Sequence, residues 1–176
     1  MSKLADQLTN EEAIETDNEN LKNYNQYYFL NGYNAFDINN VTEGNVLTFN
    51  LMYCYKKFDW KTTIPELDEQ LFKNLAYRLQ MSYRDNFYHS HVHAADVVNH
   101  LSYLLYTCGI KEMCSMTDKD VFVTLISGAA HDMDHPGTNN LLEIKTRSKL
   151  ATLYNDQSVL EHHHAASFYF MIENSK

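Results

Sequence analysis

The sequence is poor in the residues that interrupt or cross-link a chain. Its 176 residues include five glycines and two prolines, which favours long helices joined by short polar turns over a β architecture. Three cysteines, Cys54, Cys108 and Cys114, are an odd number without a CxxC spacing. They fit reduced thiols in a cytoplasmic protein better than a disulfide framework. We therefore expect an all-α protein held together by an apolar core.

The chain also has few basic residues and no long apolar run. Lys and Arg number 14 against 23 Asp and Glu, and the formal net charge is −9. Nucleic-acid binding relies on clustered positive charge, so we expect no nucleic-acid partner. The longest apolar stretches, 101–110 and 121–130, are too short to span a bilayer, and the first residues do not resemble a secretory signal.

The first 27 residues differ in composition from the rest. Residues 1–27 are rich in Asn, Asp and Glu and have few large apolar side chains, so we expect a polar, disordered lead-in. The chain as a whole is 44% hydrophobic, which is enough for residues 28–176 to bury one core. One domain is therefore expected after the lead-in.

Two helices can be placed from local signals. Pro65 suits an early helical position, and the helix after it should bury a stripe of leucines spaced by four. The stripe consists of Leu67, Leu71, Leu75 and Leu79. A capping pair, Thr117 and Asp120, predicts the start of a second helix, and Pro136-Gly137 predicts its end. Small residues at 127–130 would let another helix approach this one closely.

Most of the nine histidines fall in two short motifs and the tract 162–164. His89 and His93 are four residues apart, so on a helix they share one face. His131 and Asp132 are adjacent, and a terminal turn of the preceding helix can aim both inward. Two nitrogens with a carboxylate suit Zn²⁺, while the spare oxygen of Asp132 can bridge to Mg²⁺ or Mn²⁺.

The clustering favours a divalent-metal hydrolase site over a structural role for these histidines. Two cations about 3.5–4 Å apart neutralise phosphate charge and lower the pKa of a shared water. A nearby histidine can then protonate the leaving oxygen. The predicted chemistry is phosphoester hydrolysis, in which the cations rather than the acidic chain attract the anionic substrate.

Three stretches together resemble a known family. They are Tyr88-His89 with His93-Ala-Ala-Asp-Val97, the run from His131 to Leu142, and Tyr154 to Glu161 with His163-His164. In this order they resemble the motifs of the class I 3′,5′-cyclic-nucleotide phosphodiesterase catalytic domain. The resemblance implies an all-α, multi-helix HD-type phosphodiesterase fold, truncated so that 28–176 is its N-terminal part.

The resemblance also implies the metal ligands and the general acid. His93, His131 and Asp132 would bind the tighter, zinc-like ion, and Asp132 would also reach a second ion, Mg²⁺ or Mn²⁺. His89 would be the catalytic acid that protonates the departing 3′ oxygen. The substrate would be cAMP, cGMP or both, opened to the 5′-monophosphate in cyclic-nucleotide signalling.

Four further residues receive roles from the same resemblance. His135 and Glu161 would hold metal-bound waters, and Tyr88 and Asn140 would help to form the substrate pocket. From spacing alone, Glu161 has another interpretation, because Ser158 and Glu161 also match a capping box.

Two alternatives stay open beside this interpretation. The remaining part of such a domain would supply a further aspartate ligand, a purine-binding glutamine and an aromatic clamp. The first alternative is that, without these groups, the chain is a catalytically inactive truncated fragment or a metal-binding decoy. A different HD hydrolase of non-cyclic nucleotides is the second alternative, and the Pro136-Gly-x-x-Asn140 extension argues against it.

Overall fold

The computed structural model describes residues 32–174, and within this range every regular element is a helix. The all-α prediction is confirmed. The predicted lead-in, 1–27, lies outside the described residues. Across 32–174 the structure has no helix that is both long and apolar enough to cross a membrane.

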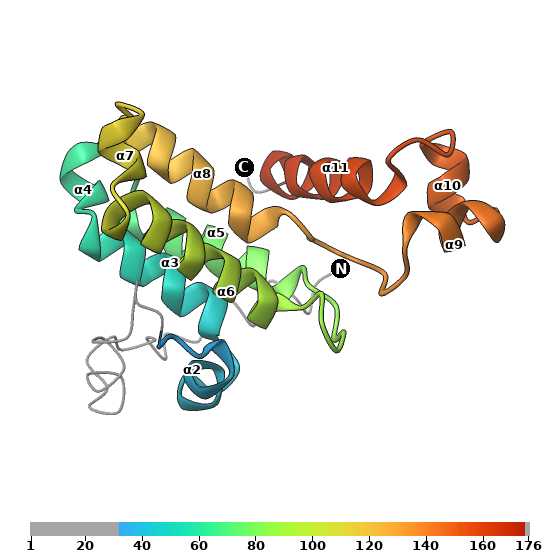
Figure 1. The fold of residues 1–176 in the computed structure, drawn as a ribbon, viewed down its shortest axis with the longest axis horizontal. Coiled ribbons are helices and arrows are strands. Elements are labelled where there is room, and N and C mark those ends of the chain that lie inside the picture. Colours follow the sequence, from blue (N-terminus) through green and yellow to red (C-terminus); the bar gives the residue numbers. More distant parts are fainter. Residues whose placement is uncertain (1–31, 175–176) are drawn as a thin grey trace.

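Figure 1 shows the helices coloured in chain order. In chain order they are α2 (Ala35–Val41), α3 (Val46–Lys57), α4 (Trp60–Thr63), α5 (Glu69–Met81), α6 (His91–Ser102), the π-helix η3 (Tyr103–Thr107), α7 (Ile110–Met113), α8 (Asp118–Ala130), α9 (Asn140–Lys145), α10 (Lys149–Leu153) and α11 (Val159–Glu173).

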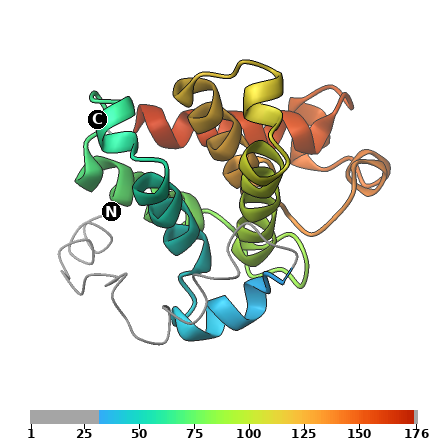
Figure 2. The same ribbon diagram turned by 60° about the vertical axis from the view of Figure 1, so that its left-hand side comes forward.

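The core lies among α3, α5, α6 and α8, which pack against one another in both ribbon views (Figures 1 and 2). Trp60 is fully buried, and its ring meets the edges or faces of Phe72 and Phe122 at centroid distances of 5.7 and 5.2 Å. Burying an aromatic or aliphatic side chain of this size stabilises a fold by about 1.5–3 kcal/mol. This apolar contact joins α4 to α5 and to α8, the helix that ends at the candidate site.

Helices α6 and α8 run antiparallel and approach closely at Gly128. A Cβ on Gly128 would lie 2.4 Å from Leu101 Cδ1 and 3.5 Å from Val97 Cγ1. The close approach predicted from the small residues at 127–130 is therefore present. It brings the beginning of α6 beside the end of α8.

Helix α8 begins where its capping pair predicts and ends earlier than its proline predicts. Thr117 Oγ1 accepts from the Asp120 N–H, and the Asp120 carboxylate accepts from the Thr117 N–H, which completes a capping box. The helix ends at Ala130 rather than at Pro136. A turn follows in which Asp134 has the left-handed φ of +56°. His131 and Asp132 therefore lie where the helix gives way to a turn and not on a continuous helix.

Two details predicted for α5 are wrong. The helix begins at Glu69 after the N-cap Asp68, so Pro65 stands outside it. Leu71 is 68% exposed, whereas Phe72 is fully buried. Leu79 is fully buried and Leu67 and Leu75 pack against the core, so Leu71 is the one leucine of the stripe that faces solvent. A spacing of four advances about 40° beyond one turn at each step, so leucines spaced by four do not share one line along the helix.

The last three helices extend the body beyond the end of α8. Helices α9 and α10 pack against each other at one end of the molecule, and α11 returns alongside them toward α8 (Figure 1). Met171 on α11 joins the main apolar core. This return brings the histidine tract of α11 back to the turn that follows α8.

Candidate metal centre

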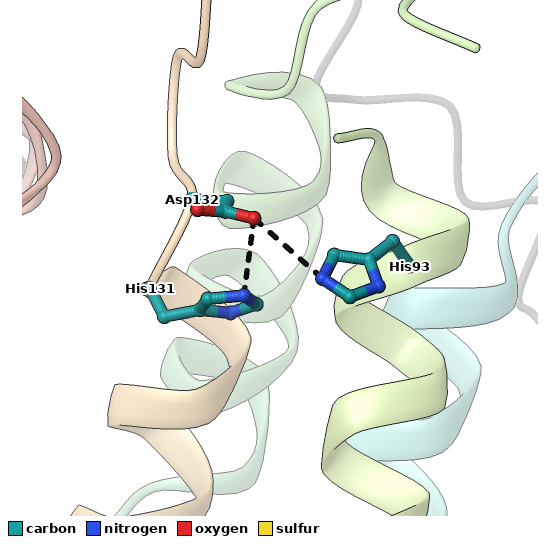
Figure 3. Close-up of side chains that lie close together, drawn as sticks. All are labelled: His93, His131 and Asp132. Atoms are coloured by element: carbon teal, nitrogen blue, oxygen red, sulfur yellow. Dashed lines mark ion pairs between the residues drawn. The ribbon is translucent and has the colours of Figure 1, made fainter. Parts of the chain in front are cut away.

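His93, His131 and Asp132 converge where α6 begins and α8 ends (Figure 3). Ser90 is the N-cap of α6, so His93 lies in its first turn. His131 is the C-cap of α8, and Asp132 follows it. The Asp132 Oδ2 atom is 3.6 Å from His93 Nε2 and 3.1 Å from His131 Nε2.

These distances fit a bound cation. A tetrahedral Zn²⁺ with bonds of about 2.0–2.1 Å holds its ligand atoms about 3.3 Å apart, between the two distances. His131 Nδ1 hydrogen-bonds to the Gly128 carbonyl at 2.8 Å. Since a carbonyl only accepts, Nδ1 donates a proton to it. The hydrogen bond to Asp132 raises the pKa of His131, and a bound cation would take the place of the Nε2 proton in that bond.

The other oxygen of Asp132 faces a second histidine. His164 on α11 is buried, with 5% of its surface exposed. Its Nδ1 donates to the Met133 carbonyl at 2.8 Å, which leaves the lone pair of Nε2 directed to Asp132 Oδ1 at 3.7 Å. Asp132 thus presents one oxygen to each of two groups of potential ligands.

Asp132 is held in the charged form that metal binding requires. Burial acts to raise its pKa, but the hydrogen bond from His131 and the charges of nearby histidines outweigh burial and lower the pKa to about 2. The carboxylate is therefore ionised at neutral pH.

His135 lies within ligand distance of Asp132 and His164, yet its hydrogen bonding points to another role. The Gly137 N–H donates to His135 Nδ1 at 3.0 Å. Burial, followed by the charge of His89, lowers the pKa of His135 to about 4, so the ring is neutral. Its proton then lies on Nε2, which can donate to a water but offers no lone pair to a metal.

His89 lies before α6 and not on it, so the helical premise for its spacing with His93 is wrong. Its ring still lies 6.2 Å from the His93 ring and stacks on His135 at 3.8 Å and 9°. The Asn86 side chain donates to the carbonyls of both His89 and His135 and holds the two segments together. Within residues 32–174, the ring nitrogens of His89 make no hydrogen bond and are open to a ligand.

Tyr88 borders this cluster from the outside. Its side chain is 64% exposed, and its ring lies 4.6 Å from the His93 ring. This position beside the metal-type residues is compatible with the predicted pocket role, which remains a prediction.

Asn140 and Glu161, which were given separate roles, contact each other. Asn140 Nδ2 donates to both Glu161 oxygens at 3.2 and 3.0 Å, and Asn140 Oδ1 accepts from the Leu160 N–H at 2.9 Å. The capping box expected from Ser158 is absent, since Ser158 has a left-handed backbone and makes no side-chain cap bond. Asn140 of α9 therefore caps α11 from outside the helix.

Comparisons with known proteins agree with this geometry. The family model for 3′,5′-cyclic nucleotide phosphodiesterase matches residues 88–176, which is half of the chain. This chain belongs to the 3′,5′-cyclic nucleotide phosphodiesterase family. The matched range contains His89, His93, the turn after α8 and the histidine tract of α11.

Individual relatives support the same family membership. It is 35% identical to the probable 3′,5′-cyclic-AMP phosphodiesterase pde-4 of Caenorhabditis elegans over 147 residues, 82% of this chain and 21% of that protein. It is 43% identical to the human dual specificity calcium/calmodulin-dependent 3′,5′-cyclic nucleotide phosphodiesterase 1C over 91 residues, 52% of this chain and 13% of that protein. The chain therefore spans about a fifth or less of these relatives.

A solved structure shares the fold. The structure of LmjPDEB1 in complex with IBMX has a TM-score of 0.73 and 25% sequence identity, over 83% of this chain and 44% of that one. Family membership implies the use of divalent cations, and the two groups of His and Asp atoms around Asp132 fit such use.

No role was predicted for Asp134, and His163 and His164 were singled out only through the family resemblance. The tract 162–164 could be a solvated helix face, but His164 is buried and His163 hydrogen-bonds to Asp134. The available signal was the succession of three histidines, because at least one of three consecutive helical residues faces the packed side. Their partners are about 30 positions away, and no local pattern identifies them.

Proposed function

We propose that this phosphodiesterase chain takes part in hydrolysing the 3′,5′-cyclic phosphate of cAMP, cGMP or both to the 5′-monophosphate. The observation that carries the proposal is the two-sided placement of Asp132. One of its oxygens faces His93 and His131, and the other faces His164. Two cations that share one carboxylate are suited to phosphoester hydrolysis.

The donor atoms support an unequal pair of ions. His93 and His131 offer two imidazole nitrogens, which with one carboxylate oxygen suit Zn²⁺. On the other side of Asp132, the neutral His135 is arranged to hold a water through its Nε2–H. An ion that retains several waters, such as Mg²⁺ or Mn²⁺, fits that side. When bound, the cations would supply positive charge against the phosphate and lower the pKa of a water.

The remaining steps fall to side chains of the chain itself. The ring nitrogens of His89, which make no hydrogen bond to any described residue, lie beside the cluster, and His89 would donate a proton to the departing 3′ oxygen of the nucleotide. His135 would orient a water, and Glu161 would share that task while Asn140 holds its carboxylate. Tyr88, exposed next to His93, would border the bound nucleotide.

The direct test is hydrolysis of cAMP and cGMP by the purified chain with Zn²⁺ plus Mg²⁺ or Mn²⁺. Turnover should be lost in His89→Ala and in Asp132→Ala. His100→Ala is a matched control, since His100 is an exposed histidine of α6 that pairs with Asp96 away from the cluster. Circular dichroism of each variant separates loss of chemistry from loss of fold.

A second candidate is cation binding without turnover. The match covers 44% of the solved neighbour's chain, so the site described here is built from that part of the fold alone. A folded chain that binds Zn²⁺ at His93, His131 and Asp132 but hydrolyses neither nucleotide would establish this candidate. Turnover that His89→Ala abolishes would exclude it.

A further inference from the structure

Asp134 joins three segments that are distant in sequence. Its carboxylate accepts from Arg84 Nε at 2.6 Å and from Arg84 Nη2 at 3.1 Å. The same carboxylate binds His163 Nε2 of α11 at 2.8 Å, and the Asp134 N–H donates to the Ser82 carbonyl at 3.2 Å. The end of α5, the turn after α8 and helix α11 therefore meet at one side chain.

This junction lies next to the contact that orients His164. Two consecutive turn residues bind two consecutive residues of α11: Met133 binds His164 through its carbonyl, and Asp134 binds His163 through its carboxylate. A helix held at two adjacent side chains has a defined rotation about its axis. That rotation points His164 Nε2 at Asp132.

The conformation of Asp134 argues that its side chain matters more than its backbone. The φ of +56° is unfavourable for a residue with a Cβ and is natural for glycine. Arg84 and Asp134 are also both partly exposed, and exposed ion pairs contribute little stability. An aspartate in this place is therefore better explained by what its carboxylate holds than by the energy of the pair.

We propose that Asp134 is a positioning residue of the cation site, which holds α11 between Arg84 and His163 so that His164 meets Asp132. The inference rests on the proposed function, in which Asp132 is shared by two cations. Asp134 itself binds no cation and touches no substrate. It acts through the placement of α11.

The surroundings of the junction allow a chemical test. Arg84 and Asp134 line a cavity of about 490 Å³ that also reaches Ser167 and Asn174 of α11. A small planar cation can therefore enter from solvent and reach the Asp134 carboxylate if the Arg84 side chain is removed. Guanidinium reproduces the forked donors of arginine, whereas tetramethylammonium has the same charge and no donor.

The first experiment compares Co²⁺ affinity, read from the visible absorption of the bound ion, in the wild-type chain and in Asp134→Gly and Asp134→Asn. Glycine and asparagine both tolerate the left-handed backbone, so the turn is retained while the charged carboxylate is lost. We expect roughly tenfold weaker Co²⁺ binding, as for other residues that orient metal ligands. Wild-type affinity in both variants would overturn the proposal.

Asp59→Gly is the matched control. Asp59 also has a left-handed backbone, with φ of +48°, and within the described residues its carboxylate makes no hydrogen bond or ion pair. This variant should bind Co²⁺ as the wild type does. A loss equal to that of Asp134→Gly would show a general effect of the substitution and would overturn the positioning role.

The second experiment uses Arg84→Ala with millimolar guanidinium or tetramethylammonium. Co²⁺ affinity should fall in this variant and recover with guanidinium only, because the carboxylate requires directed donors. Equal recovery with both ions, or with neither, would overturn the role of the Arg84 fork. Because the variant is compared with itself, a general loss of stability does not mimic the result.

The positioning role and the proposed function can fail separately. A wild-type chain that binds Co²⁺ but hydrolyses neither nucleotide removes the proposed function, while the affinities of the variants still decide the role of Asp134. A wild-type chain that binds no Co²⁺ overturns both.

Discussion

Replacing Asn140 with alanine should destabilise the protein through the start of α11. In the wild type, Asn140 Oδ1 accepts from the Leu160 N–H at 2.9 Å, and Asn140 Nδ2 donates to both oxygens of Glu161. Ser158, the residue at the N-cap position, supplies no side-chain bond. Alanine would therefore leave the first turn of α11 without a side-chain cap.

The size of the effect follows from these two contacts. Loss of a side-chain cap costs about 1 kcal/mol of the free energy of unfolding. The contact with Glu161 adds roughly 0–1 kcal/mol, since that carboxylate is exposed and water replaces the lost donor. A total of about 1–2 kcal/mol corresponds to a fall in Tm of roughly 2–8 °C for a chain of this length.

Thermal and urea unfolding followed by circular dichroism would measure the change. Two variants separate the contacts: Asn140→Asp keeps the acceptor for the Leu160 N–H but places two carboxylates together, and adding Glu161→Gln to it restores a donor between them. We expect the double variant to be more stable than Asn140→Asp alone. An Asn140→Ala variant that melts with the wild type would refute the external cap.

Three further predictions concern packing, metal binding and pH. Gly128→Val should lower the free energy of unfolding by about 2–3 kcal/mol and weaken Zn²⁺ binding, because the valine side chain would collide with Leu101 and separate α6 from α8. Calorimetry would measure both effects. An unchanged stability and an unchanged Zn²⁺ affinity would contradict the close approach of the two helices. Zn²⁺ at about 100 times its Kd should raise the free energy of unfolding of the wild type by about 2.7 kcal/mol, and EDTA should reverse this rise. A His93→Ala variant that is stabilised by Zn²⁺ to the same extent would show that the ion binds elsewhere. The pKa of Glu161 is lowered by the hydrogen bond from Asn140, so this contact is complete above the ordinary carboxyl pKa and is lost as the pH falls through the lowered one. The Tm difference between the wild type and Asn140→Ala should therefore become smaller as the pH is lowered. A Tm difference that grows at low pH would contradict a stabilising contact between Asn140 and the ionised Glu161.

Local signals in the sequence predicted those helix ends that depend only on residues a few positions apart. Thr117 and Asp120 are three residues apart and form the expected capping box at the start of α8. Ser158 and Glu161 have the same spacing, yet their box does not form, because the backbone of Ser158 is left-handed and Asn140 holds the Glu161 carboxylate and the neighbouring Leu160 N–H instead. The spacing is identical in the two cases, and the cap conformation together with a residue about 20 positions away distinguishes them.

The candidate site shows the same division. His93, His131 and Asp132 were expected together from their residue types and motifs, and the antiparallel packing of α6 and α8 brings them within ligand distance. His89 was placed near His93 for a partly wrong reason, since it precedes the helix. Stacking on His135, which no spacing rule anticipates, determines where its ring lies.

The sequence by itself determined the all-α class and the identity of the residues that offer metal ligands, because helix content and side-chain chemistry are local properties. Only the tertiary structure decided which atoms face one another. The rotation of α11, the proton positions on His131, His135 and His164, and the two-sided use of Asp132 all depend on hydrogen bonds to groups elsewhere in the fold. Such contacts form when helices distant in sequence pack together, and their geometry is therefore a property of the packed body rather than of any segment.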